Sequence, residues 1–186
     1  FCFFAAYGAV YPYVSLYFKR LGMSGAEIGV LTTLPSVANI LAPPLAVALL
    51  TRLGMARTAV PILLTAGLVP ATLLLGTQAF WPLFVVYFWT ALLQAPVPPL
   101  LDDATLRRIE RTRFDYGRIR LWGSVGFIVA VGAVGILSER AGLGVALFGQ
   151  IAWMALSALV AWLLARNGEL ASPGNTAARQ SLLLSA

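Results

Sequence analysis

Six long apolar runs follow one another along the chain, and short polar connections separate them. The runs cover residues 1–18, 26–50, 59–75, 80–101, 121–137 and 144–164. Each is close to the ~20 residues that an α-helix needs to cross the hydrocarbon core of a bilayer. One such run is compatible with a buried helix of a soluble protein. Six in succession predict an all-α membrane protein with six transmembrane helices.

The composition supports a membrane protein over a soluble one. Hydrophobic residues make up 60% of the 186 residues and charged residues 11%, against about 45–50% and about 25% in a typical soluble domain. A soluble domain of this size buries only about 70% of the surface that its unfolded chain exposes. Much of the apolar surface would therefore stay in water, whereas a bilayer removes that cost.

The basic residues are distributed unevenly among the connections. A formal charge of +6 could indicate a protein that binds nucleic acid, which would need a basic face on a soluble fold. Here the basic residues lie in short gaps between apolar runs, so we exclude nucleic acid as a partner.

Ten of the 13 Lys and Arg residues lie in the second gap, the fourth gap and the tail. These ten are Arg52, Arg57, Arg107, Arg108, Arg111, Arg113, Arg118, Arg120, Arg166 and Arg179. The positive-inside rule places that side in the cytoplasm, together with both ends of the six-helix unit.

Signatures of catalysis are missing from the sequence. There is a single cysteine, Cys2, and no histidine, so neither an internal disulfide nor the commonest general base or metal ligand is available. Phosphate-binding glycine loops, H-E-x-x-H and C-x-x-C are also absent. We therefore expect no enzyme activity, no metal and no cofactor.

The segment 100–127 carries the most informative charges. Asp102 and Asp103 follow directly on the fourth apolar run, and Arg118 and Arg120 open the fifth. If the fourth helix continues past Leu101, two antiparallel helices place an acid and a guanidinium at similar depth. A charge at mid-bilayer costs ~2.5–3.5 kcal/mol on insertion scales, so such groups usually pair and face a cavity. The planar fork of an arginine binds a carboxylate or several hydroxyls with defined geometry.

A solvated cytoplasmic loop is the alternative for this segment, with arginines that only set the topology. We favour that interpretation for Arg107, Arg108, Arg111 and Arg113. For Arg120, which lies between Ile119 and Leu121, the spacing alone leaves both interpretations open.

A family resemblance rests on the same segment. The sequence YGRIRLWGSVGF, from Tyr116 to Phe127, resembles the start of the fifth helix in the phenylpropionate-permease-like and lactose-permease-like branch of the major facilitator superfamily. Asp102, sixteen residues before Arg118, falls on the acidic position of that branch. The aromatic opening from Tyr7 to Pro12 is similar as well. The resemblance implies that residues 1–166 form the N-terminal six-helix half, and that residues 167–186 are a cytoplasmic linker toward a missing C-terminal half.

The resemblance also implies a function. Members of this branch are secondary transporters of small solutes such as sugars, nucleosides and aromatic acids, and many are proton symporters that work by alternating access. A chain of this kind is expected in the bacterial inner membrane. In lactose permease the corresponding acid and arginine contact the sugar, so Asp102 and Arg120 are expected to bind substrate, with Arg118 behind them. Aspartate reaches less far than glutamate, so the substrate need not be a sugar.

One motif of the superfamily is only partly present. The loop between the second and third helices usually reads G-x-x-x-D-[RK]-x-G, and here Val47 and Thr51 replace the first glycine and the acid. Arg52 and Gly54 remain, and we expect them to belong to a gating loop. Without the acid, gating is expected to be weaker or differently built.

Other functions remain open at this point. The chain begins without Met inside an apolar run, which we interpret as part of a longer protein. A stop codon soon after Ala186 would instead favour a stand-alone six-helix protein that acts as a dimeric channel or half-transporter, or as a membrane scaffold.

Overall fold

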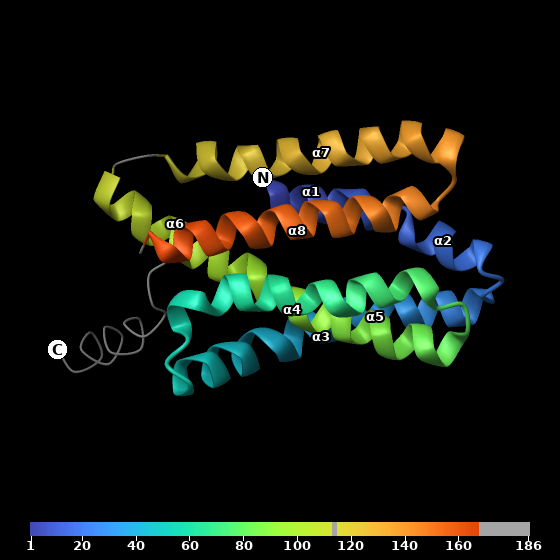
Figure 1. Ribbon diagram of the computed structural model, residues 1–186, viewed down its shortest axis with the longest axis horizontal. Helices are drawn as coiled ribbons and strands as arrows, with labels where there is room; N and C mark the ends of the chain where they lie inside the picture. The colour runs from blue at the N-terminus through green and yellow to red at the C-terminus, as the bar shows by residue number, and fades with distance from the viewer. Residues whose placement is uncertain (113–114, 168–186) are drawn as a thin grey trace.

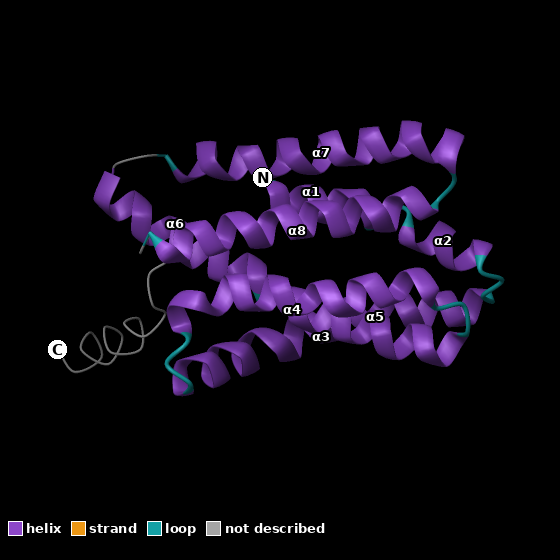
Figure 2. Cartoon of the chain, viewed as in Figure 1, coloured by secondary structure: helices purple, strands orange, loops and turns teal. Residues whose placement is uncertain are grey.

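The computed structural model describes residues 1–112 and 115–167. This part of the chain is helical apart from short turns and contains no β-strand (Figure 2). Its helices are α1 (Cys2–Val10), α2 (Val14–Arg20), α3 (Gly25–Arg52), η1 (Ala56–Thr58), α4 (Ala59–Leu73), η2 (Leu74–Gly76), α5 (Phe80–Gln94), α6 (Val97–Thr112), α7 (Tyr116–Ala141) and α8 (Gly144–Arg166). Arg113, Arg179 and nearly all of the predicted linker lie outside the described residues.

Five helical segments are long and apolar enough to cross a membrane, which confirms the predicted fold class. They are Gly25–Arg52, Ala59–Gly76, Phe80–Arg107, Tyr116–Ala141 and Gly144–Arg166. The first predicted span differs, because residues 1–18 do not form one continuous helix. A turn at residues 11–13 separates α1 from α2. Pro12 lies in that turn, where its missing N–H and fixed φ interrupt the helical hydrogen bonds.

The fourth span is also divided. α5 ends at Gln94 and α6 begins at Val97, around a short turn that contains Pro96. Pro96, Pro98 and Pro99 each lack the backbone N–H that a continuous helix would use, so three of the four residues from 96 to 99 cannot donate a helical hydrogen bond. The helix then continues past Leu101 to Thr112, so that Asp102 lies within a helix and the condition for pairing it with the next helix is met.

Small residues allow the central helices to approach closely. α1 packs against α7 and α8, α4 lies between α5 and α8, and α3 packs mainly on α5 (Figure 1). The α1, α7 and α8 contact contains a buried cluster of Ala5, Ala9, Ala130, Val134 and Ala146. α3 and α7 lie on opposite sides of the bundle and are the least buried of the five spans.

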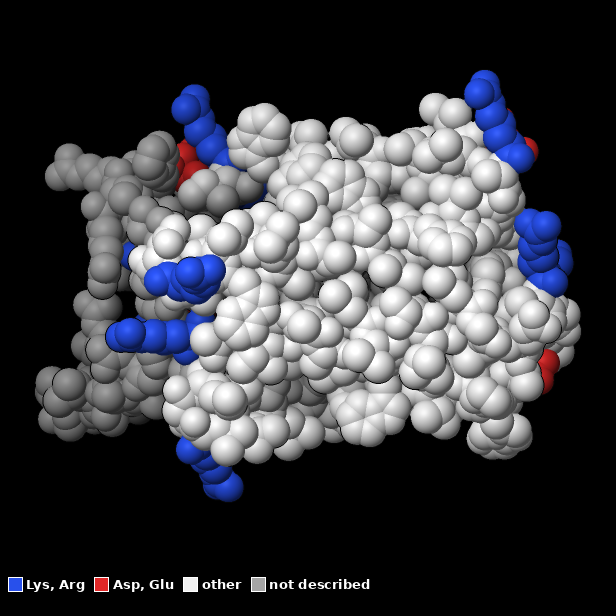
Figure 3. Space-filling model, viewed as in Figure 1, with Lys and Arg blue, Asp and Glu red and all other residues white. Residues whose placement is uncertain are grey.

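Charges gather at the two ends of the bundle. On the face shown in Figure 3, Lys and Arg lie at both ends, and no charged side chain is visible on the surface between them. The end of α3, the start of α4, the end of α6, the start of α7 and the end of α8 share one end of the molecule (Figure 1). The predicted cytoplasmic connections therefore lie together, whereas the assignment of this end to the cytoplasm stays a prediction.

Candidate functional site

The site begins with the cap of α7. Asp115 has an extended backbone, and its Oδ1 accepts a hydrogen bond from the backbone N–H of Gly117 at 2.8 Å. Such a cap satisfies one of the free N–H groups at a helix start. The helix therefore begins at Tyr116, five residues before the apolar run that predicts it. Tyr116 and Arg120 are then one turn apart on the same face.

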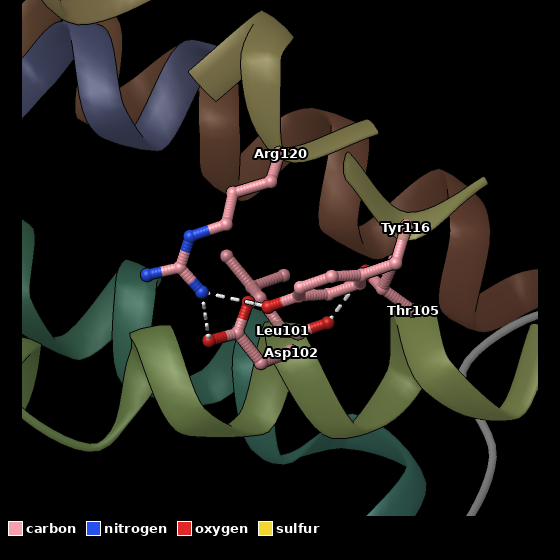
Figure 4. Close-up of polar contacts among 5 residues, drawn as sticks. All are labelled: Leu101, Asp102, Thr105, Tyr116 and Arg120. Carbon is pink, nitrogen blue, oxygen red and sulfur yellow. Dashed lines mark hydrogen bonds and ion pairs between the residues drawn. The ribbon is translucent and has the colours of Figure 1, made fainter. Parts of the chain in front are cut away.

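Asp102, Tyr116 and Arg120 form a connected polar group between α6 and α7 (Figure 4). Arg120 Nη1 donates to the Tyr116 hydroxyl at 2.7 Å, and this hydroxyl donates to Asp102 Oδ1 at 3.2 Å. The direct contact between Arg120 Nη1 and Asp102 Oδ2 is longer, at 3.4 Å. The guanidinium also lies 5.9 Å from the centre of the Tyr116 ring. The predicted pairing of Asp102 with Arg120 is thus present, and a tyrosine joins it.

This polar group is accessible in the described part of the chain. The Arg120 side chain is 61% exposed and that of Asp102 is 40% exposed. Charged groups that face lipid are costly, so an accessible pair at the end of a membrane helix normally borders water or protein. Together the two charges cancel, while carboxylate oxygens and guanidinium N–H groups remain for further hydrogen bonds.

The neighbouring acid, Asp103, serves a different contact. It forms an ion pair with Arg107 one turn later on α6, with Nη2 and Oδ2 3.1 Å apart. Arg107 Nε also donates to both carboxylate oxygens, at 3.2 and 3.1 Å. Successive residues on a helix point about 100° apart, which explains why Asp102 and Asp103 face different partners.

Arg118 does not join the group. It is exposed on α7 and makes no hydrogen bond or ion pair within residues 1–112 and 115–167. Two residues of helix correspond to a rotation of about 200°, so Arg118 and Arg120 lie on nearly opposite faces of α7. The structure brings Asp102 and Arg120 together, as predicted, and leaves Arg118 apart.

A hollow of about 360 Å³ extends from Arg120 along α7 toward α1. It is lined by Phe4, Arg120, Gly123, Ser124, Phe127 and Ile128. The absence of a side chain at Gly123 admits the Phe4 ring, because a Cβ there would lie 2.9 Å from the ring. The helical spacing 120, 124, 127 and 128 is visible in the sequence. Tyr116, Ser124 and Phe127 belong to the segment that carries the family resemblance, but they were not among the predicted site residues. Phe4 belongs to a helix that is distant in the sequence, and no local pattern predicts that it lines the hollow.

The predicted gating loop contains a helix terminus. Gly54 has φ +69°. Its N–H donates to the Thr51 carbonyl at 3.1 Å, and the N–H of Met55 donates to the Leu50 carbonyl at 2.8 Å. This is the glycine-terminated arrangement that commonly ends helices. Arg52 is exposed and forms no ion pair within the described part of the chain. The geometry explains Gly54 as the end of α3, and a role in gating remains a prediction.

Comparisons with known proteins agree with the resemblance seen in the sequence. The model of the MFS_1 like family matches residues 1–182. A maltose permease of Geobacillus stearothermophilus is 39% identical over 150 residues, and the match covers 75% of this chain and 36% of the permease. A probable 3-phenylpropionic acid transporter of Escherichia coli K12 is 30% identical over 74% of this chain and 36% of its own length.

The architecture has a match among solved structures. The crystal structure of the nucleoside transporter NupG superposes with a TM-score of 0.77 at 21% identity, over 88% of this chain and 41% of that chain. This similarity supports the helix arrangement.

The chain spans about a third of the length of the curated relatives that it matches. These relatives are transporters rather than enzymes, as the sequence predicts. The chain belongs to the MFS_1 like family, within the major facilitator superfamily of membrane transporters.

Proposed function

We propose that the chain forms the N-terminal half of a secondary transporter that carries a sugar, a nucleoside or an aromatic acid across the bacterial inner membrane. Transport is coupled to protons and works by alternating access. The solute lies between this six-helix half and a C-terminal half, and the two halves rock around it. The match covers less than half of each longer relative, which supports a second half. The names of the relatives suggest the candidate solutes.

The observation that carries the proposal is the accessible Asp102–Tyr116–Arg120 group on a helical bundle whose flanks are apolar. Exposed side chains elsewhere on α7 include Leu121, Trp122, Val129 and Ile136, which suit lipid or an apolar partner. A charged pair on such a helix is stable where water or a polar partner reaches it. We therefore assign the face with Asp102 and Arg120 to the solute pathway.

The groups around the hollow suit a solute with both polar and apolar parts. Arg120 lines the hollow and supplies donors, and Phe4 and Phe127 line it with apolar surface. Asp102, which contacts Arg120, supplies acceptors next to the hollow. Binding sites for small molecules commonly combine mostly apolar walls with a few well-placed polar groups. Arg118 takes a secondary role at the mouth of the pathway, and the loop with Arg52 and Gly54 takes part in gating.

The test is uptake of labelled maltose, 3-phenylpropionate and uridine by cells that express the full-length protein. Arg120→Lys keeps the charge but removes the planar fork. We expect it to raise the KM of the transported solute by about tenfold or more, the usual effect of losing a charge-assisted hydrogen bond. Unchanged KM in this variant would refute the recognition role. A protonophore should abolish accumulation, and accumulation that persists would rule out proton coupling.

Arg140→Lys is the matched control, because Arg140 lies in the last turn of the same helix, at the opposite end. We expect its KM to equal that of the unmodified protein. Failure of the unmodified protein to take up any of the three solutes would exclude these solute classes.

A further inference from the structure

The Tyr116 hydroxyl contacts each of the two charged groups at a shorter distance than they contact each other. It accepts from Arg120 Nη1 at 2.7 Å and donates to Asp102 Oδ1 at 3.2 Å, whereas the ion pair itself spans 3.4 Å. A phenolic hydroxyl has one donor and can also accept, and here both roles are used. The guanidinium is therefore tied to the hydroxyl more closely than to the carboxylate.

The Arg120 side chain needs a hydrogen-bond partner such as this hydroxyl to hold one orientation. This side chain is largely exposed, and a long arginine side chain loses rotamer entropy when it is ordered. Tyr116 is half-buried, lies one turn earlier on α7 and is held near the capped start of that helix. The more rigid residue thus limits the conformations of the more mobile one.

The hydrogen bonds to Tyr116 and Asp102 use only part of the Arg120 guanidinium. In the described part of the chain only Nη1 of Arg120 makes hydrogen bonds, and both go to this polar group. The other terminal nitrogen points away from Asp102 and Tyr116 (Figure 4). Arg120 also lines the hollow with Phe4 and Ser124.

We propose that Tyr116 is a positioning residue for solute recognition: its hydroxyl fixes the Arg120 guanidinium so that the unused N–H groups are presented to the solute. Tyr116 acts through Arg120 and does not itself contact the solute. This inference rests on the proposed role of Arg120 in solute binding.

Tyr116→Phe tests the inference, because it removes the hydroxyl and keeps the ring beside the guanidinium. In the full-length transporter we expect KM for the transported solute, among maltose, 3-phenylpropionate and uridine, to rise about tenfold. The maximal rate should stay within about twofold, since one orienting hydrogen bond of the binding site is lost. Unchanged KM in Tyr116→Phe would overturn the inference.

The same substitution in an Arg120→Lys background separates positioning from direct contact. Without the guanidinium there is nothing for the hydroxyl to orient, so Tyr116→Phe should change KM by less than about twofold. A full tenfold effect in this background would mean that the hydroxyl touches the solute itself, and would also overturn the inference. Solute-dependent thermal stabilisation of the purified protein gives the same comparison without transport.

Tyr13→Phe is the matched control. The Tyr13 hydroxyl donates to the Val131 carbonyl of α7 at 2.8 Å, far along the helix from Arg120. Its loss should leave KM within about twofold. A normal KM in Arg120→Lys would refute the proposed function, whereas a raised KM there with a normal KM in Tyr116→Phe would refute only the role of Tyr116.

Discussion

Glycine at a few positions determines how closely α1 and α7 approach. At Gly8 of α1, an added Cβ would clash with the backbone carbonyl of Phe127, and the Cα of Phe127 would lie 3.0 Å from it. At Gly126 of α7, an added Cβ would lie 2.8 Å from the backbone oxygen of Phe1. Backbone atoms cannot move aside as the end of a flexible side chain can. These contacts hold α1 against the helix that carries Arg120.

Gly8→Ala should therefore lower the free energy of unfolding by about 1–3 kcal/mol, the usual cost of overpacking. Thermal unfolding of the full-length protein in detergent measures the effect. Gly132→Ala on α7 is the control, because nothing lies within 4 Å of a Cβ there. Alanine is the better helix former by up to about 1 kcal/mol, so the control should be neutral or stabilising. Equal midpoints for the two variants would contradict the close contact.

Residue patterns predict part of the site. The positions of Asp102 and Arg120 on either side of a short connection were enough to pair them, because antiparallel helices bring such residues to the same depth. Tyr116 was not singled out, although its spacing of four from Arg120 is a local signal. Phe4 and its contact with Gly123 depend on how distant helices pack, which spacing within one segment does not encode.

Helix boundaries were less predictable than the helices themselves. Hydropathy places the fifth span at residues 121–137, but α7 extends from Tyr116 to Ala141, because capping by Asp115 starts the helix in a polar segment. In the first span, apolar character hides the interruption at Pro12. Apolar runs report which residues face lipid or protein, whereas caps and prolines determine where a helix begins and ends.

The cap at Asp115 matters for both stability and recognition. Asp115→Ala should lower the free energy of unfolding by ~1 kcal/mol, because the Gly117 N–H loses its partner. It should also raise the KM of the transported solute, because the first turn of α7, which contains Tyr116, frays without its cap. Asp115→Asn is the control, because asparagine caps as well as aspartate. Thermal unfolding measures the change in stability, and uptake measures the change in KM. If Asp115→Asn is as defective as Asp115→Ala, the charge of Asp115 rather than its capping is responsible.

The whole bundle is built so that its charges collect at the ends. Helices from α3 to α8 run back and forth along its length, with α5 and α6 together as one pass (Figure 1). The connections with most of the arginines consequently share one end, which also holds the Asp102–Arg120 pair. If that end faces the cytoplasm, the polar group lies at the cytoplasmic mouth of the solute pathway.

Cysteine labelling tests this orientation. In a cysteine-free version of the full-length protein, a cysteine is introduced at Gln78, between η2 and α5, or at Met55, between α3 and η1. Both residues are exposed and lie in connections at opposite ends of the bundle. A membrane-impermeant maleimide should label Gln78→Cys in intact cells and Met55→Cys only after permeabilisation, because the arginine-rich end is retained inside during insertion. The reverse pattern would place the Asp102–Arg120 group at the outer face, where an entering solute meets it first.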